Sequence, residues 1–186
     1  MPDLMVDLIV SLDTCAAADG WPGLWGMGGP DYFAFLGEQE PHTTLMGSTT
    51  YRLMSQMAEE EPEAFAALAE TDKVVFSSTL GEPLEWANTR LVADDPVAAV
   101  GAMKRDAALP LRTLGSLTLA RSLLVAGLVD RLRLVVFPVI NGATGRERVF
   151  DGYPDVRLEL VESRTFDGRL QLLDYVPTVL DHPPLS

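Results

Sequence analysis

Three short stretches rich in glycine and hydroxyl side chains could bind a phosphate group. They are Gly47-Ser48-Thr49-Thr50, Ser77-Ser78-Thr79 and Gly115-Ser116-Leu117-Thr118. Each follows a short apolar run that is typical of a buried strand, and the first and third precede apolar residues at helical spacing. Backbone N–H groups at the start of a helix, together with hydroxyl donors, bind phosphate oxygens. The three stretches are therefore candidates for a phosphate or pyrophosphate site.

The segment from Leu111 to Leu128 shows this pattern most clearly. It predicts a short buried strand, a turn at Gly115-Ser116 and a helix whose N-terminus is capped by the Ser116 hydroxyl. Gly127 is expected to end that helix in a left-handed conformation. Taken alone, the segment is equally consistent with a tight connection that binds nothing. The same pattern recurs at residues 43–60, which favours binding because a dinucleotide needs more than one phosphate anchor.

Two carboxyl groups are placed where they could contact a ligand or transfer a proton. Asp13 follows the apolar run of residues 5–12, at the strand end where open α/β sheets bind their ligands. Asp31 lies in the first turn of a helix expected over residues 30–38. Each also has a purely structural interpretation, Asp13 as part of a turn and Asp31 as a negative charge near the positive end of a helix dipole.

Large aromatic side chains surround Asp31 in the sequence. The glycine-rich segment of residues 14–29 contains Trp21 and Trp25, and Tyr32 and Phe35 follow on the expected helix. These side chains either cap the hydrophobic core or line a ligand pocket. In a pocket, a carboxyl group that they enclose would hold a proton more readily and could pass it to a substrate.

The composition predicts a folded protein with an acidic surface. Of its 186 residues 47% are hydrophobic, and 14 basic against 27 acidic residues give a net charge of −13. This charge argues against a nucleic acid or an anionic membrane as partner, and the strongest apolar run, residues 134–140, is too short to cross a bilayer. Cys15 is the only cysteine, which excludes an internal disulfide and fits a reducing cytoplasm. His42 and His182 are too few and too scattered to suggest a metal site.

Strands and helices are expected to alternate up to residue 128, and strands alone to follow. The remaining expected helices cover residues 48–60, 62–70 and 96–105, and the strands cover residues 43–46, 73–76, 89–92, 131–140, 158–165 and 169–176. Asp167-Gly168 predicts a hairpin between the last two strands. This order predicts an α/β fold with helices on both faces of a mixed sheet, parallel at first and antiparallel at its C-terminal edge. We expect one domain over residues 1–186, with an ordered core over residues 5–176 and a loose tail over residues 177–186.

Five segments occur in an order that resembles the dihydrofolate-reductase-like superfamily. They are Ser11-Leu12-Asp13 and residues 45–51, 73–80, 114–130 and 136–142. No single segment is specific for this superfamily, but the five segments in this order are. Within the superfamily, the sequence is more similar to one branch than to the rest, and that branch resembles the reductase (C-terminal) domain of the bifunctional riboflavin biosynthesis deaminase-reductase. The resemblance covers residues 5–176 and implies a three-layer, dihydrofolate-reductase-like fold.

The resemblance also implies a function, an NADPH-dependent reductase (with NADH as the other cofactor) of a pterin, a ribosylaminopyrimidine or a similar heterocycle. The cofactor phosphates would be held by Gly47, Ser48, Thr49 and Thr50 and by Gly115, Ser116, Leu117 and Thr118, and its adenosine side by Ser77, Ser78 and Thr79. The substrate would contact Trp21, Trp25, Asp31 and Phe35. Asp31, or else Asp13, would assist the proton transfer. Related proteins often pair through their C-terminal strands, which implies a homodimer.

The sequence departs from the family pattern at three positions. Ser48 and Ser78 stand where the family usually has arginine, and Thr14 replaces a usual glycine. Arginine is the favoured partner of a 2′-phosphate because it stays charged and donates two parallel hydrogen bonds. Arg52 could compensate from the same expected helix as Ser48. These departures leave two alternatives open, a nucleotide-binding module without catalysis and a flavin-binding protein.

Overall fold

The computed structural model describes residues 2–20 and 24–183. Its strands are β1 (Leu4–Ser11), β2 (Cys15–Ala18), β3 (Thr43–Gly47), β4 (Lys73–Phe76), β5 (Thr89–Val92), β6 (Leu111–Thr113), β7 (Arg131–Phe137), β8 (Gly145–Arg148), β9 (Val156–Phe166) and β10 (Leu170–Val179). Its helices are α1 (Pro30–Gly37), α2 (Ser48–Glu60), α3 (Ala66–Glu70), α4 (Pro96–Asp106) and α5 (Leu117–Val125), with short 3-10 turns at Leu24–Gly26 and Gly142–Thr144.

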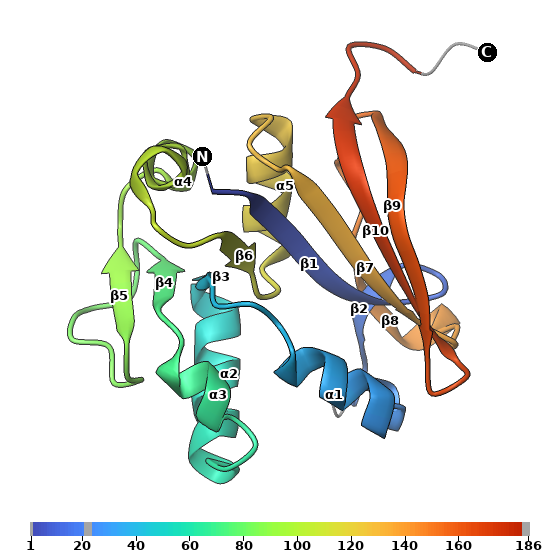
Figure 1. Ribbon diagram of the computed structural model, residues 1–186, viewed down its shortest axis with the longest axis horizontal. Coiled ribbons are helices and arrows are strands. Elements are labelled where there is room, and N and C mark those ends of the chain that lie inside the picture. The colour runs from blue at the N-terminus through green and yellow to red at the C-terminus, as the bar shows by residue number, and fades with distance from the viewer. Residues whose placement is uncertain (1, 21–23, 184–186) are drawn as a thin grey trace. The chain divides into compact units, whose positions relative to one another are not determined.

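Eight of these strands form one mixed sheet in the order β5-β4-β3-β6-β1-β7-β10-β9, and β2 pairs with β8 in a small second sheet (Figure 1). The strands from β5 to β1 pair in parallel, whereas β7, β10 and β9 pair antiparallel. This arrangement confirms the predicted α/β fold class, with parallel strands first and an antiparallel C-terminal edge.

The contacts within the chain divide it into two compact units. The first unit comprises residues 1–6 and 40–129, and the second comprises residues 7–39 and 130–186. Strand β1 therefore contributes residues to both units. The expectation of a single domain over residues 1–186 stays a prediction.

The first unit is built on short parallel strands, of which β3 and β4 supply buried residues. Leu45 and Met46 of β3 and Val74 and Val75 of β4 are at most 1% exposed. Buried parallel strands appear in a sequence as short apolar runs, which is why the expected bounds of β4 match the structure. The expected bounds of β5 also match, although this edge strand has no buried residue. Helix α2 packs against β3 and β4.

The second unit is built on the antiparallel strands β7, β10 and β9. Helix α1 contributes Tyr32 and Phe35 to its core, which also contains Val135, Phe137, Phe166, Leu170 and Leu172. The predicted hairpin joins β9 to β10, and Asp167 and Gly168 have positive φ values of 50° and 66°. Both central residues of a type I′ turn need such values, and aspartate and glycine adopt them readily.

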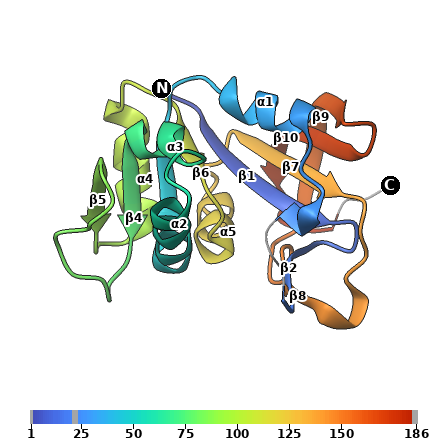
Figure 2. The same ribbon diagram turned by 90° about the horizontal axis from the view of Figure 1, so that it is seen from below.

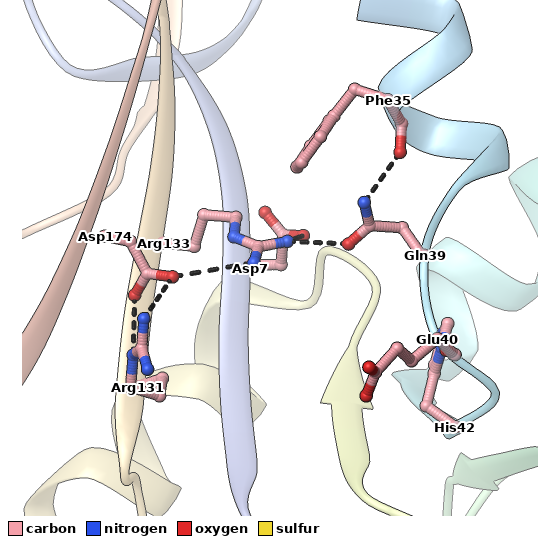
Figure 3. Close-up of polar contacts among 8 residues, drawn as sticks. All are labelled: Asp7, Phe35, Gln39, Glu40, His42, Arg131, Arg133 and Asp174. Carbon is pink, nitrogen blue, oxygen red and sulfur yellow. Dashed lines mark hydrogen bonds and ion pairs between the residues drawn. The ribbon is translucent and has the colours of Figure 1, made fainter. Parts of the chain in front are cut away.

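A buried network of charges ties three elements of the second unit together (Figure 3). Asp174 of β10 is fully buried and accepts two hydrogen bonds from the Arg131 guanidinium, of 2.9 and 2.8 Å. Arg133 lies 3.5 Å from the same carboxylate, donates to the Gln39 side chain at 2.8 Å and packs over the Phe35 ring. A buried carboxylate is tolerated only when charged donors satisfy it, and here two guanidinium groups do so.

Several expected boundaries are wrong. The helix expected over residues 62–70 covers only Ala66–Glu70, because the bonds from Ala64 N–H to Glu61 and from Ala66 N–H to Glu63 span three residues and form turns. The strand expected over residues 131–140 ends at Phe137, directly before Pro138, which has no N–H group for the sheet.

Two further differences concern segments that were expected to lack regular structure. Strands β2 and β8 lie in or beside the expected loops and pair antiparallel, with Cys15 opposite Arg148. The expected tail after Pro177 continues β10 to Val179, and the Leu180 N–H group donates to the Asp155 carbonyl at 2.8 Å. Long-range partners stabilise these strands, and their own residues show little alternation.

Lys73 is a buried cation at the start of β4. Its ammonium group donates to the carbonyl oxygens of Leu68, Ala69 and Thr71 at 2.8, 3.0 and 2.6 Å, at the C-terminal end of α3. It also lies 4.8 Å from the centre of the Trp86 ring. Burial lowers the pKa of Lys73 from 10.5 to about 8, although Asp72 and Glu70 oppose the shift.

The lowered pKa of Lys73 predicts a pH-dependent contribution to stability. Between pH 8 and 10.5 the unfolded chain keeps the Lys73 proton and the folded chain has lost it, so the free energy of unfolding rises with pH. The unfolding free energy of the wild type minus that of Lys73→Met should therefore become more positive across this range, by at most about 1.4 kcal/mol for each pH unit. Urea unfolding of both proteins at several pH values measures it. A difference that stays constant or shrinks would contradict this prediction.

Candidate functional site

The three glycine and hydroxyl stretches lie at one edge of the sheet, in the first unit. Strands β4, β3 and β6 are parallel neighbours, with Gly47 opposite Phe76 and Leu45 opposite Thr113. The segments that leave their carboxyl ends must therefore start at the same edge. The structure thus brings together the turns that begin at Gly47, Ser77 and Gly115, as the sequence predicts.

The Gly47 and Gly115 turns are joined directly to each other. The Gly47 N–H group donates to Ser116 Oγ at 2.5 Å, and Thr50 Oγ1 lies 3.0 Å from the same oxygen. A Cβ atom on Gly47 would lie 3.0 Å from Ser116 Oγ, and one on Gly115 would lie 3.1 Å from Thr50 Oγ1. A side chain at either glycine would therefore crowd the hydroxyl group of the other turn, and Gly115 also has a positive φ of 58°. We call this arrangement the interlocked turns.

The role predicted for Ser116 in capping its own helix is wrong. Ser116 precedes α5, but it has a left-handed backbone with φ of 61°, and its side chain makes no capping hydrogen bond. The hydroxyl points to the neighbouring turn because Gly47 offers it an N–H donor there. The predicted end of α5 is confirmed, since Gly127 has φ of +67° and its N–H group donates to the Leu124 carbonyl.

The N-termini of α2 and α5 keep N–H groups that no side chain of the cap residue satisfies. Gly47 caps α2 without a side chain, and Ser116 directs its hydroxyl elsewhere. The two helices are neighbours in Figure 2, as the hydrogen bonds between their first turns require. Thr49 and Thr118 are exposed beside these N–H groups. This is the donor set that binds phosphate oxygens at helix N-termini.

The turn after β4 is stabilised mainly by its own residues. Ser77 Oγ accepts hydrogen bonds from the N–H groups of Thr79 and Leu80 at 3.1 and 3.2 Å. The Ser77 N–H group donates to the Val92 carbonyl of β5 at 3.1 Å. Ser78 and Thr79 are exposed at this edge. The Ser77 side chain therefore stabilises the turn, whereas Ser78 and Thr79 face solvent.

The Asp13 carboxylate binds the backbone of the loop after β7. Its carboxylate accepts hydrogen bonds from Ser11 Oγ at 2.7 Å and from the N–H groups of Asn141 and Gly142 at 3.1 and 3.0 Å. These hydrogen bonds, that from Ser11 foremost, lower the pKa of Asp13 to about 2. The carboxyl group is therefore ionised at neutral pH, which favours its structural interpretation over a role as proton donor.

Asp31 is exposed and paired with the tip of the β9–β10 hairpin. The N–H groups of Asp31 and Tyr32 donate to the Asp167 carboxylate at 3.0 and 3.2 Å, and the Asp167 N–H group donates to Asp31 Oδ2 at 3.3 Å. Gly29 is required here, because its Cβ atom would lie 2.4 Å from Asp167 Cγ. Tyr32 and Phe35 pack in the core, which agrees with the first of the two interpretations of the aromatic side chains.

The aromatic residues expected at a pocket pack in the core where the structure describes them. Trp25 lies 5.3 Å from the Phe137 ring and donates from Nε1 to Asn141 Oδ1 at 2.9 Å. Phe35 is buried against Phe166, at 4.9 Å between ring centres. Trp21, the remaining aromatic residue of that prediction, lies outside the described residues.

A model of the RibD C-terminal domain matches residues 2–172. The chain belongs to the RibD C-terminal domain family. This confirms the resemblance to the reductase branch of the dihydrofolate-reductase-like superfamily.

Relatives of this RibD-family protein support the same fold. It is 26% identical over 180 residues to the uncharacterized protein YyaP of Bacillus subtilis (strain 168), covering 92% of this chain and 93% of YyaP. It is similar in structure to RibD of Acinetobacter baumannii, with a TM-score of 0.68 and 16% identity, covering 96% of this chain and 58% of that one. It is also similar to dihydrofolate reductase of Enterococcus faecalis complexed with NADP(H), with a TM-score of 0.60 and 15% identity, covering 94% and 96% of the two chains.

Two residues of the RibD-family protein have structural roles that sequence reasoning missed. Asp167 caps α1, and Asn141 holds both Trp25 and Asp13. Both act across more than 100 residues of sequence, so no local pattern indicates them. In the described part of the chain, no group of three His, Cys, Asp or Glu side chains could hold a metal ion, and no helix has the length and apolar character to cross a bilayer.

The interlocked turns predict different costs for two substitutions of Ser116. Ser116→Ala leaves the Gly47 N–H group without its acceptor and keeps a side chain at φ of 61°, so we expect a loss of about 1–3 kcal/mol in unfolding free energy. Ser116→Gly also removes the acceptor but tolerates the positive φ, so it should be milder by roughly 1 kcal/mol. Urea unfolding measures both.

The control for this prediction is Ser122→Ala on the same helix, whose hydroxyl only donates to the Thr118 carbonyl within the helix. It should change the unfolding free energy by less than about 0.5 kcal/mol. Equal stability of Ser116→Ala and Ser122→Ala would mean that the hydrogen bond between the turns contributes nothing.

Proposed function

We propose that this RibD-family protein is a reductase that uses NADPH or NADH to reduce a C=N or C=O bond of a small heterocycle, such as a pterin or a ribosylaminopyrimidine. The observation that carries the proposal is the pair of interlocked turns, which places the N-termini of α2 and α5 together at one sheet edge. The family supports it, and the dihydrofolate reductase to which this chain is similar is complexed with NADP(H).

The residues of this edge fit a dinucleotide diphosphate. The N–H groups at the start of α2 and α5, with the hydroxyls of Ser48, Thr49, Thr50 and Thr118, would donate to the phosphate oxygens. Gly47, Gly115, Ser116 and Leu117 would shape the backbone around them, and Ser77, Ser78 and Thr79 would face the adenosine side. A bound nicotinamide cofactor supplies hydride, and the chain supplies its position and the local electrostatics.

Asp31 is the carboxyl group that we propose to contact the substrate. It is exposed on the first turn of α1, and the hairpin tip fixes its carboxylate through the Asp167 N–H group. Asp13, the other candidate, already accepts three hydrogen bonds, one from Ser11 Oγ and two from N–H groups of the loop after β7. We propose that Trp25 and Phe35 act by holding α1 and its preceding loop against the core.

The first test is binding. Tryptophan fluorescence of the purified protein should be quenched on titration with NADPH or NADH, because a nicotinamide ring is a strong acceptor of tryptophan emission. If neither dinucleotide binds, the proposed function is wrong. If one binds tightly but no pterin or pyrimidine is turned over, the alternative of a nucleotide-binding module without catalysis holds. A yellow purified protein would favour the flavin-binding alternative.

The second step of the test distinguishes an effect on substrate turnover from an effect on cofactor binding. Asp31→Asn should lower turnover by roughly a hundredfold or more, as expected for loss of a positioned proton-transfer group, and leave dinucleotide binding unchanged. Glu38→Gln changes an exposed carboxylate just past the other end of α1 and should leave both unchanged. Equal turnover of the wild type and Asp31→Asn would exclude Asp31 as the substrate-contacting carboxyl group.

We also propose a homodimer that forms through the C-terminal strands, in a reducing compartment such as the cytoplasm. β9 is the last strand of the large sheet, and Leu160 and Val161 on it are 55% and 50% exposed. Exposed apolar side chains on an edge strand commonly mark a surface that pairs with another chain. The buried free thiol of Cys15 is compatible with such a compartment.

Light scattering should give twice the monomer mass for the wild type and the monomer mass for Leu160→Glu, because a charge on β9 opposes pairing. Leu53→Glu places the same charge on α2, where Leu53 is 47% exposed, and should leave the dimer intact. A monomeric wild type would contradict the proposed assembly without affecting the proposed reaction.

A further inference from the structure

The charges beside the interlocked turns bear on which dinucleotide this protein selects. Within the first unit, the sheet edge continues past Gly47 to the carboxyl ends of β4 and β5. Phe76 lies opposite Val92, so the segments after these two strands, residues 77–82 and 93–95, leave the sheet side by side. These two segments therefore continue the sheet edge beside the interlocked turns within the first unit.

No basic residue lies in these two segments. Residues 74–89 and 91–103 contain no lysine or arginine, whereas Glu82, Asp94 and Asp95 all lie in the two segments and are exposed. Lys73 lies at the other end of β4, where its ammonium group donates hydrogen bonds to three carbonyl oxygens. The edge therefore presents hydroxyl groups and carboxylates to whatever lies on it.

The basic residue nearest in sequence to these segments, Arg90, lies two residues before the end of β5 and donates to Met103 Sδ at 3.5 Å. Arg52 and Arg121 are the fifth residues of α2 and α5. Each lies about 6 Å along its helix axis from the first helical residue, a little more than one turn. A diphosphate carries two negative charges in NADH and in NADPH alike, so cations at these positions favour both cofactors equally.

NADPH differs from NADH by one phosphate on the adenosine ribose. This group carries a charge of about −1.5 to −2 at neutral pH and needs cationic partners to replace its water. An unmodified ribose instead presents hydroxyl groups, which donate hydrogen bonds to carboxylates. Ser77 cannot adapt to a phosphate readily, because its oxygen already accepts two N–H groups of its own turn.

We infer that the edge formed by residues 77–82 and 93–95 selects the dinucleotide without the 2′-phosphate, so that NADH is the preferred cofactor. Ser78 is the position at which this preference is set, because it is exposed and lies in the first turn past β4. Asp94 adds to the preference by repelling the phosphate. The inference rests on the proposed function, since it concerns the same site.

The experiment compares the dissociation constants of NADH and NADPH by fluorescence titration at low and high salt. NADH should bind at least about fivefold more tightly at low salt, and the ratio should fall at high salt because salt screens the repulsion of the 2′-phosphate. Equal or tighter binding of NADPH would overturn the inference and leave the proposed function standing. Absence of binding by either dinucleotide would overturn the proposed function itself.

Two substitutions test the assigned positions. Ser78→Arg should strengthen NADPH binding by roughly tenfold or more and leave NADH binding nearly unchanged, since a new guanidinium can pair with the phosphate. Asp94→Asn should act in the same direction with a smaller effect. The control, Ala108→Arg, adds the same charge to an exposed loop before β6, at the other end of the strands, and should leave the ratio unchanged. If Ala108→Arg shifts the ratio as much as Ser78→Arg, net charge and not the position is responsible, and the inference is wrong.

Discussion

The hydrogen bond from the Gly47 N–H group to Ser116 Oγ is the contact on which the candidate site depends. It joins the ends of two neighbouring parallel strands and thereby brings the starts of α2 and α5 together. Both glycines are needed for this contact, because a Cβ atom on either would meet a hydroxyl of the other turn at about 3 Å. The same feature that packs the two turns leaves the first N–H groups of both helices for a ligand.

Local donors explain how a chain with a net charge of −13 could hold an anion. Backbone N–H groups and helix dipoles act over the first turn of a helix and do not depend on the total charge of the protein. Three charged groups of the fold have partners within the chain. Asp174 is paired with two arginines, Lys73 is bound by three carbonyl oxygens, and Asp13 is bound by a hydroxyl and two N–H groups. These groups stabilise the scaffold on which the turns are built.

The sequence predicts well what depends on local patterns. Strand β4 matches its expected bounds because a buried parallel strand appears as a short apolar run. The Asp167-Gly168 hairpin forms because its turn needs residues that adopt positive φ. What depends on distant partners could not be predicted. The Ser116 hydroxyl binds a residue 69 positions away instead of its own helix, and Asp167 caps α1 across 136 residues and so leaves Asp31 exposed. The same limit explains why the sequence does not predict β2 and β8, which pair only with each other.

The central claim is that the interlocked turns bind the diphosphate of a dinucleotide. The most direct measurement is an amide chemical-shift titration of the isotope-labelled protein with ADP-ribose, which carries the diphosphate and lacks the nicotinamide. The largest shifts are expected at the N–H groups of Ser48, Thr49, Leu117 and Thr118. Saturable shifts that are confined to other parts of the chain, or no shifts at all, would contradict it.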